Sequence, residues 1–161
     1  MTLAYVALGS NLDSPQQQVL DAMAALAALP DTQLVQRSSL YRTPPWGVLQ
    51  QPSFVNAVVE LDTELSPRAL LQALLSIERR AGRVRAERNG PRTLDLDLLH
   101  MDGLRLDFPE LTLPHPRMAE RAFVLLPLND VAPTLALPGL GTVTELLAGI
   151  DTAGCERLLE P

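Results

Sequence analysis

Two segments with strong helix-start signals lie between strand-like runs in residues 1–100. Ser14-Pro15-Gln16-Gln17 predicts the first start, because serine caps helices, proline suits the first helical position and glutamine completes a capping box. Ser66-Pro67 predicts the second start, and Gly82 predicts where that helix ends. Strand-like runs flank the two helices, at residues 3–8 (ended by Gly9), 33–41, 54–61 and 93–100.

Strand, helix, strand, strand, helix, strand is the order of a ferredoxin-like plait. This α+β fold packs helices on a mainly antiparallel sheet. After it, Asp102-Gly103 predicts a turn with a returning strand at 104–108, and helices are expected at 119–129 and 143–150. No linker divides the 161 residues, so we predict a single domain over 1–161. Many functions use this fold, so function has to be read from a site.

The charge distribution limits the partners. The net charge of −6 argues against nucleic acid and anionic membranes as partners. The chain has no lysine, and six of its thirteen arginines fall between Arg79 and Arg92, which suits one polyanionic small ligand. The single cysteine, Cys155, and the lack of a signal peptide or long apolar run predict a cytoplasmic protein.

Asp95 and Asp97 stand two apart on the strand-like run 93–100. Side chains at this spacing share one face of a strand, with Cα atoms roughly 6.5 Å apart. Two such charges repel by about 2–3 kcal/mol at an effective dielectric near 20. A solvated sheet face would tolerate this repulsion. A divalent metal would remove it, and Mg²⁺ takes one or two carboxylates together with phosphate oxygens.

The arginines just before this strand favour the metal and phosphate interpretation. Arg83, Arg85, Arg88 and Arg92 lie on an expected loop, and guanidinium groups bind phosphate bidentately. The sequence has no P-loop motif, so an arginine clamp and an aspartate-held Mg²⁺ would replace it. Glycines at both ends of the segment 83–91 permit hinge movement. Its arginines repel one another without an anion, so we predict a loop that is mobile when free and closes over a bound polyanionic ligand.

Aromatic and amide side chains provide a second group of candidates. Phe54 and Asn56 share one face of the run 54–61, as suits stacking and hydrogen bonding to a flat heterocycle. His115 lies between two prolines that restrict its backbone. Glu78, in the last turn of its helix, is weakly disfavoured by the helix dipole, which hints at a ligand-facing role. His100 is expected on the opposite face from the two aspartates, as a structural residue.

Six segments in order resemble the 6-hydroxymethyl-7,8-dihydropterin pyrophosphokinases of folate biosynthesis, almost from end to end. They are Val6–Leu12 (VALGSNL), Ser39–Pro45 (SLYRTPP), Phe54–Ala57 (FVNA), Gly82–Arg85 (GRVR), Gly90–Asp97 (GPRTLDLD) and Leu113–Met118 (LPHPRM) with Arg121 and Phe123-Val124-Leu125. The segment GPRTLDLD is the most specific of them. Two departures stand out: Asn89 replaces a frequent tryptophan, and the loop from Arg83 to Arg92 is about one residue shorter.

The resemblance implies a monomeric transferase that moves the terminal diphosphate of ATP onto a pterin hydroxymethyl group and leaves AMP. It implies two Mg²⁺ ions held by Asp95 and Asp97, with Arg83 and Arg92 also catalytic. The ATP contacts it implies are Glu78, Arg83, Arg85, Arg92, Leu98, His115 and Arg121. The pterin contacts it implies are Thr43, Pro44, Trp46, Phe54, Asn56 and Phe123. Asp97 is the nearest candidate to accept the hydroxyl proton.

Two other classes of protein are alternatives for this sequence. A non-catalytic α+β plait would bind the ligand without producing AMP. An RNA-binding plait needs exposed aromatics on a basic face, and three phenylalanines with an acidic pI of about 4.8 argue against it.

Overall fold

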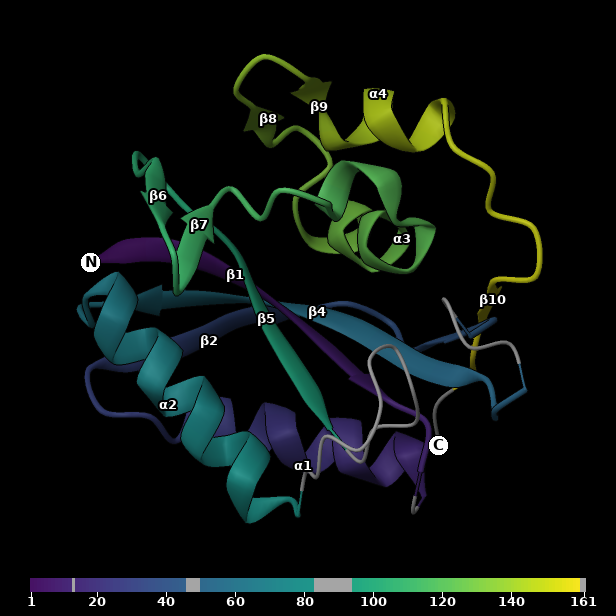
Figure 1. Ribbon diagram of the computed structural model, residues 1–161, viewed down its shortest axis with the longest axis horizontal. Coiled ribbons are helices and arrows are strands. Elements are labelled where there is room, and N and C mark those ends of the chain that lie inside the picture. The colour runs from purple at the N-terminus through teal and green to yellow at the C-terminus, as the bar shows by residue number, and fades with distance from the viewer. Residues whose placement is uncertain (13, 46–49, 83–93, 160–161) are drawn as a thin grey trace.

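A mainly antiparallel sheet forms the centre of the protein, with helices on both faces (Figure 1). The computed structural model describes residues 1–12, 14–45, 50–82 and 94–159. The strands pair in the order β10-β3-β4-β1-β5, β2 also pairs with β4, and each of these pairings is antiparallel. The strands are β1 Thr2–Ser10, β2 Thr32–Arg37, β3 Tyr41–Thr43, β4 Phe54–Thr63, β5 Asp95–Met101 and β10 Glu156–Arg157. The predicted α+β class is confirmed, and the elements follow the predicted order with one expected strand divided in two.

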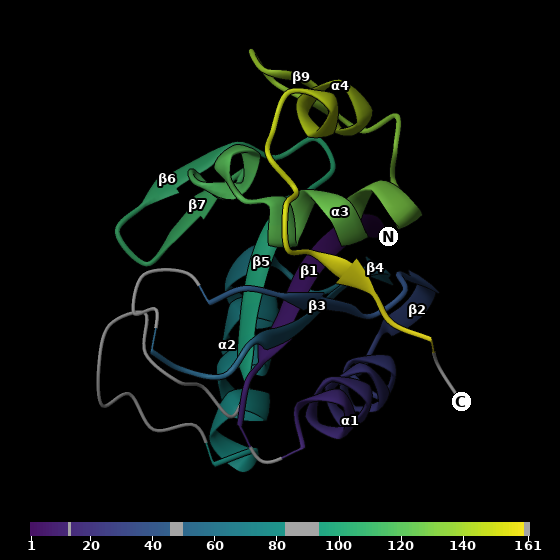
Figure 2. The same cartoon turned by 90° about the vertical axis from the view of Figure 1, so that its right-hand side faces the viewer.

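Helices cover the sheet in two layers (Figures 1 and 2). The helices are α1 Pro15–Ala27, α2 Pro67–Arg80, α3 Ala122–Val131 and α4 Val143–Ala148. The face covered by α1 and α2 we call the lower face, and the face covered by α3 we call the upper face, after Figure 1. Each layer has its own core, centred on fully buried residues such as Val6 and Leu70 below and Val58 and Leu125 above. Burial of these apolar side chains is the main stabilising contribution.

The two helix starts differ. Ser66 caps α2 as predicted, because its Oγ accepts from the backbone N–H three residues on (3.2 Å), and Gly82 (φ 79°) follows the end of that helix. The capping box predicted at α1 is wrong. Ser14 adopts a left-handed conformation (φ 61°) and makes no side-chain cap bond, and Gln17 donates instead to Asp21 (2.7 Å).

The strand expected at 33–41 is divided into β2 and β3. Ser38 lies at the division, where its backbone N–H donates to the Val58 carbonyl (2.9 Å) and its Oγ accepts from the Val58 N–H (2.9 Å). The hydroxyl thus takes the place of a main-chain acceptor, so β4 stays paired although the ladder is interrupted.

A β-bulge in β5 changes the face of His100. Tyr5 pairs with His100 while Val6 pairs with Leu98, so Leu99 is an extra residue on β5. The rings of Tyr5 and His100 stack with centroids 6.2 Å apart on the upper face. The expectation that His100 lies opposite the aspartates is therefore wrong, since a bulge reverses the alternation beyond it.

The returning strand expected at 104–108 does not pair with β5. The outer edge of β5 is bonded elsewhere, to Glu78 at Leu96 (2.7 Å) and to the His115 N–H at Leu99 (2.8 Å). The segment after the turn forms a separate two-stranded sheet with the residues that follow it. The remaining elements are β6 Leu106–Phe108, β7 Leu111–Leu113, the 3-10 helix η1 Met118–Glu120, β8 Ala136–Leu137 and β9 Gly141–Thr142. The helices expected at 119–129 and 143–150 are present as α3 and α4.

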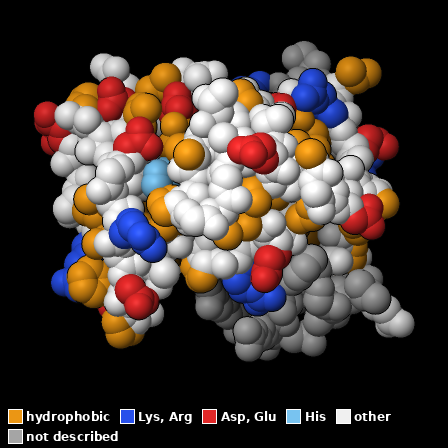
Figure 3. Space-filling view, turned by 90° about the horizontal axis from the view of Figure 1, so that it is seen from above, with side chains coloured by type: hydrophobic (Ala, Val, Ile, Leu, Met, Phe, Trp, Pro, Cys, Tyr) orange, Lys and Arg blue, Asp and Glu red, His pale blue; other side chains and the backbone are white. Residues whose placement is uncertain are grey.

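Seen from above, hydrophobic side chains show as small areas between polar and charged ones (Figure 3). Among the described residues, no helix combines the length and the apolar character needed to cross a membrane.

Candidate active site

The two aspartates lie at the start of β5 on the upper face. Asp95 and Asp97 are both half-buried, and Leu96 between them packs into the lower core, so the predicted alternation is confirmed. The buried carboxylate of Glu78 (4% exposed), at the end of α2, accepts from the Leu96 N–H at 2.7 Å. A charge-assisted bond of this kind fixes the main chain between the two aspartates.

His115 is brought beside this pair by the main chain. Its N–H donates to the Leu99 carbonyl on β5 (2.8 Å), and its Nδ1 accepts from the Arg117 N–H (3.2 Å). Burial, together with the positive charges of Arg121 and Arg117, lowers the pKa of His115 to about 4, although the Asp95 carboxylate opposes this. The imidazole is therefore neutral at pH 7. Because Nδ1 accepts, Nε2 carries the proton and is a hydrogen-bond donor.

Arg121 precedes α3 and faces the same carboxylates. Burial lowers the pKa of its guanidinium, and the charges of Asp97 and Asp95 oppose that shift, so it remains a cation. Its carbon Cζ lies 5.5 Å from the centroid of the Phe123 ring. Its buried Nε has no hydrogen-bond partner within the part of the chain that the structure describes. A buried donor on a fixed cation is suited to an anionic ligand.

A second group of side chains lies on β3 and β4, on the same upper face. Asn56 is 6% exposed and its Nδ2 donates to the Thr43 hydroxyl, while Phe54 is half-buried at the start of β4. The predicted shared face of Phe54 and Asn56 is confirmed by the burial of the alternate residues in the lower core. Phe123, the second residue of α3, is half-buried above the sheet.

Gly9 lies between the two groups, although the sequence pattern alone predicts only the end of a strand there. It is inside β1, paired with Asn56 on one side and with Asp95 on the other. A Cβ at this position would lie 2.7 Å from Asn56 Oδ1 and 3.9 Å from the Phe54 ring. The absence of a side chain at Gly9 therefore lets the Asn56 carboxamide approach the main chain of β1, next to the strand that carries the aspartates. A glycine inside a strand pattern is the signal that could have found it.

Some predicted residues are placed differently or are outside the description. The Leu98 side chain is 4% exposed in the lower core, so a contact from Leu98 to a nucleotide would have to use its main chain. Pro44 is exposed beside β3. Trp46 falls outside the described residues. So do the four loop arginines, Arg83, Arg85, Arg88 and Arg92, and with them the predicted closure of the loop.

The donor set on β5 fits a hard cation that is completed by substrate oxygens. Within residues 1–12, 14–45, 50–82 and 94–159, no group of three or more His, Cys, Asp or Glu side chains is placed to hold a metal alone. Two carboxylates with open positions toward a phosphate chain are the usual protein share of an Mg²⁺ site.

Comparisons with known proteins all point to one family. A family model described as 7,8-dihydro-6-hydroxymethylpterin-pyrophosphokinase (HPPK) matches residues 5–133. The chain is 48% identical over 158 residues to the 2-amino-4-hydroxy-6-hydroxymethyldihydropteridine pyrophosphokinase of Methylorubrum extorquens, covering 98% of this chain and 99% of that one. It is 53% identical over 154 residues to the protein of the same name from Pseudomonas aeruginosa, covering 96% and 95%.

Solved structures share the fold. The Plasmodium falciparum HPPK-DHPS structure with pteroate superposes with a TM-score of 0.74 at 15% identity. The match covers 92% of this chain and 42% of that longer one. At this identity the likeness concerns the fold alone.

Proposed function

This chain belongs to the 7,8-dihydro-6-hydroxymethylpterin-pyrophosphokinase family and transfers pyrophosphate from ATP to hydroxymethyldihydropterin in folate biosynthesis, and we propose that it does so across Gly9. The observation that carries the proposal is the cross-strand register Asn56–Gly9–Asp95. In this proposal, the register brings the residues for the heterocycle and the residues for the phosphate chain next to each other on one face. Family membership sets aside both the non-catalytic plait and the RNA-binding plait.

The phosphate side consists of the two aspartates, His115 and Arg121. The neutral imidazole would donate from Nε2 to a phosphate oxygen. The buried Nε of Arg121, which has no hydrogen-bond partner among the described residues, would do the same. Asp95 and Asp97 would hold two Mg²⁺ ions, which neutralise phosphate charge when bound. Glu78 would act here through the main chain at Leu96, and the Leu98 main chain would adjoin the nucleotide.

The loop arginines complete the phosphate side in this proposal. Arg83, Arg85 and Arg92 would bind the ATP phosphates, with Arg83 and Arg92 stabilising the charge that develops during transfer. Their guanidinium groups suit this role because they remain charged and bind phosphate bidentately.

The pterin side consists of two aromatic rings and an amide. Phe54 and Phe123 would stack on the ring from β4 and α3, and Asn56 would hydrogen-bond its edge. The hydrogen bond from Asn56 to Thr43 restricts the orientation of the carboxamide, and the remaining polar groups of Asn56 would bond the pterin. Main-chain groups near Thr43, Pro44 and Trp46 would bond the rest of the edge.

Catalysis would rest on positioning and on fixed charge. The hydroxymethyl oxygen attacks the β-phosphorus of ATP, and the bond from that phosphorus to the α,β-bridging oxygen breaks. AMP leaves with that oxygen, and Asp97 takes the hydroxyl proton. We also propose that the enzyme is cytoplasmic and that residues 1–161 form one domain. We propose that it is a monomer, and sedimentation velocity would test this oligomeric state.

The experiment compares Asp95→Asn and Asp97→Asn with Asp107→Asn, an exposed carboxylate on β6. The nucleotide product is identified by chromatography, and binding of the Mg²⁺ complex of a non-hydrolysable ATP analogue is measured by calorimetry. The wild type and Asp107→Asn should form AMP. Each β5 variant should lose about 10²-fold or more in rate and lose the Mg²⁺ dependence of nucleotide binding. Normal turnover in either β5 variant would refute the metal-ligand role.

A further inference from the structure

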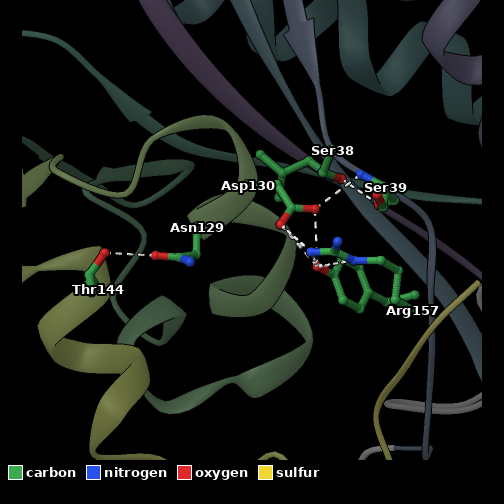
Figure 4. A network of polar contacts seen from close by, with 8 residues as sticks. Ser38, Ser39, Asn129, Asp130, Thr144 and Arg157 are labelled. Carbon is green, nitrogen blue, oxygen red and sulfur yellow. Dashed lines mark hydrogen bonds and ion pairs between the residues drawn. The ribbon is translucent and has the colours of Figure 1, made fainter.

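Asp130, in the last turn of α3, collects hydrogen bonds from three other segments (Figure 4). Its carboxylate, 17% exposed, accepts from the Ser39 N–H (3.1 Å), from the Tyr41 hydroxyl (3.0 Å to each oxygen) and from Arg157 (3.0 Å). These donors come from the link before β3, from β3 itself and from β10. One carboxylate thus joins α3 to the edge of the sheet.

Tyr41 is the centre of this cluster. The residue is 4% exposed, and its hydroxyl accepts from Arg157 Nε (3.2 Å) and Nη2 (2.9 Å) while it donates to Asp130. The Arg157 guanidinium also lies 5.6 Å from the centroid of the tyrosine ring. Burial raises the pKa of Tyr41, so the hydroxyl keeps its proton at neutral pH. A partly buried charge pair that shares a hydroxyl in this way has a restricted geometry.

The segment after α4 supports β3 from its outer side (Figure 2). Arg157 pairs with Tyr41 across the β10–β3 ladder, and the next residue, Leu158, donates its N–H to the Leu40 carbonyl (2.8 Å). Gly154 (φ 83°) packs against Pro44, since a Cβ at Gly154 would be in van der Waals contact with Pro44 Cγ (3.4 Å). The strand β3 is therefore held by β4 on one side and by this returning segment on the other.

The helix α3 connects this cluster to the active face. Asp130 and Phe123 are seven residues apart, which is about two turns, so they lie on nearly the same side of the helix. Pro127 between them has no N–H to donate to the Phe123 carbonyl, so the first turns of α3 lack one ladder bond. The position of Phe123 above the sheet therefore depends on contacts outside the helix. The Asp130 carboxylate supplies such contacts, through its hydrogen bonds to Ser39, Tyr41 and Arg157.

We propose that Asp130, Tyr41 and Arg157 form a positioning cluster that sets the gap between Phe123 and the β3–β4 edge, and so sets the affinity for the pterin. None of the three is among the residues that we propose contact the pterin. The cluster fixes β3, which carries Thr43 and through it Asn56, and it fixes α3, which carries Phe123. The inference rests on the proposed function, because it takes these residues as the pterin site.

The test uses two substitutions of minimal size, Tyr41→Phe and Asp130→Asn. The first removes a single oxygen and keeps the ring beneath Arg157, so it remains informative even where Asp130→Asn fails to fold. The matched controls are Asn129→Ala, which breaks the neighbouring bond from Thr144 (2.8 Å; Figure 4), and Glu156→Gln, which breaks the exposed ion pair to Arg42 (3.0 Å). Both controls change bonds of the same elements outside the cluster.

Steady-state kinetics and calorimetry then separate positioning from simple structural support. Tyr41→Phe and Asp130→Asn should each raise the KM and Kd for hydroxymethyldihydropterin at least fivefold. Their kcat and their Kd for a non-hydrolysable ATP analogue should stay within twofold of the wild type, and the two controls should match the wild type throughout. A lowered melting temperature with an unchanged pterin Kd in both variants would overturn the proposal.

Phe123→Ala distinguishes this inference from the assignment on which it rests. If Phe123→Ala leaves the pterin Kd unchanged, the proposed pterin slot is wrong and the positioning inference falls with it. If Phe123→Ala weakens pterin binding while Tyr41→Phe and Asp130→Asn do not, the slot stands and the positioning inference alone is wrong.

Discussion

Replacing Gly9 by alanine should damage pterin binding through Asn56. The new Cβ would lie 2.7 Å from Asn56 Oδ1, where ordinary van der Waals contact begins at 3.4 Å. The carboxamide must therefore move by about 0.7 Å, away from the position that its bond to Thr43 now holds. Asn56 is 6% exposed, so it has little free space into which to move.

The size of the effect follows from the groups that lose their partners. A buried hydrogen-bonding group left unpaired costs about 1–3 kcal/mol, which corresponds to a pterin Kd raised roughly 5- to 150-fold. Overpacking a core position costs about 1–3 kcal/mol of folding stability, so the melting temperature should fall by roughly 2–12 °C. The Kd of an ATP analogue should change less than twofold, because the phosphate side lies beyond the clash.

Calorimetry on four variants tests this reasoning. Gly149→Ala is the control, because its nearest atom would be a carbonyl oxygen 3.8 Å away at the end of α4. Asn56→Ala removes the group that the new methyl strikes, so adding Gly9→Ala to it should cost no further affinity. Wild-type pterin affinity in Gly9→Ala, or fully additive losses in the double variant, would show that Gly9 does not act through Asn56.

Three further predictions follow from local contacts. The His115 imidazole should titrate with a pKa of about 4 by NMR. Because this pKa is below that of the unfolded chain, the free energy of unfolding should fall as the pH drops from about 6.5 towards 4. A measured pKa near 6.5 would contradict the burial argument. Glu78→Ala leaves the Leu96 N–H without its Glu78 acceptor and should lower the free energy of unfolding in urea by about 1–3 kcal/mol and reduce the activity. An unchanged urea midpoint would refute this role of Glu78. Ser66→Ala should cost about 0.5–2 kcal/mol as a lost cap, whereas Ser14→Ala, which removes no cap bond, should be nearly neutral; equal losses would contradict the observed caps.

The sequence was most informative where a local pattern decides the structure. Alternation along a strand placed Asp95 and Asp97 on one face, and did the same for Phe54 and Asn56. The roles given to those residues came from the resemblance to a family, because spacing alone left a solvated face or a packed core as alternatives. The match over residues 5–133 shows the family, and the roles of individual residues are proposals.

The parts that local patterns missed depend on contacts between distant segments. The bulge that turns His100 is a main-chain insertion, and an alternating side-chain pattern does not reveal it. The residues Tyr41, Asp130 and Arg157 are separated by 89 and 27 positions, so no local motif joins them. Gly9 was visible in the sequence, but its meaning depends on which residues lie opposite it on β4 and β5.

A crystal structure with Mn²⁺ in place of Mg²⁺, a non-hydrolysable ATP analogue and hydroxymethyldihydropterin would test the proposed site most directly. The account predicts anomalous scattering beside the carboxylates of Asp95 and Asp97, and a pterin ring between Phe54 and Phe123 with its edge on Asn56. Manganese held away from β5, or a pterin bound on another face of the sheet, would contradict it.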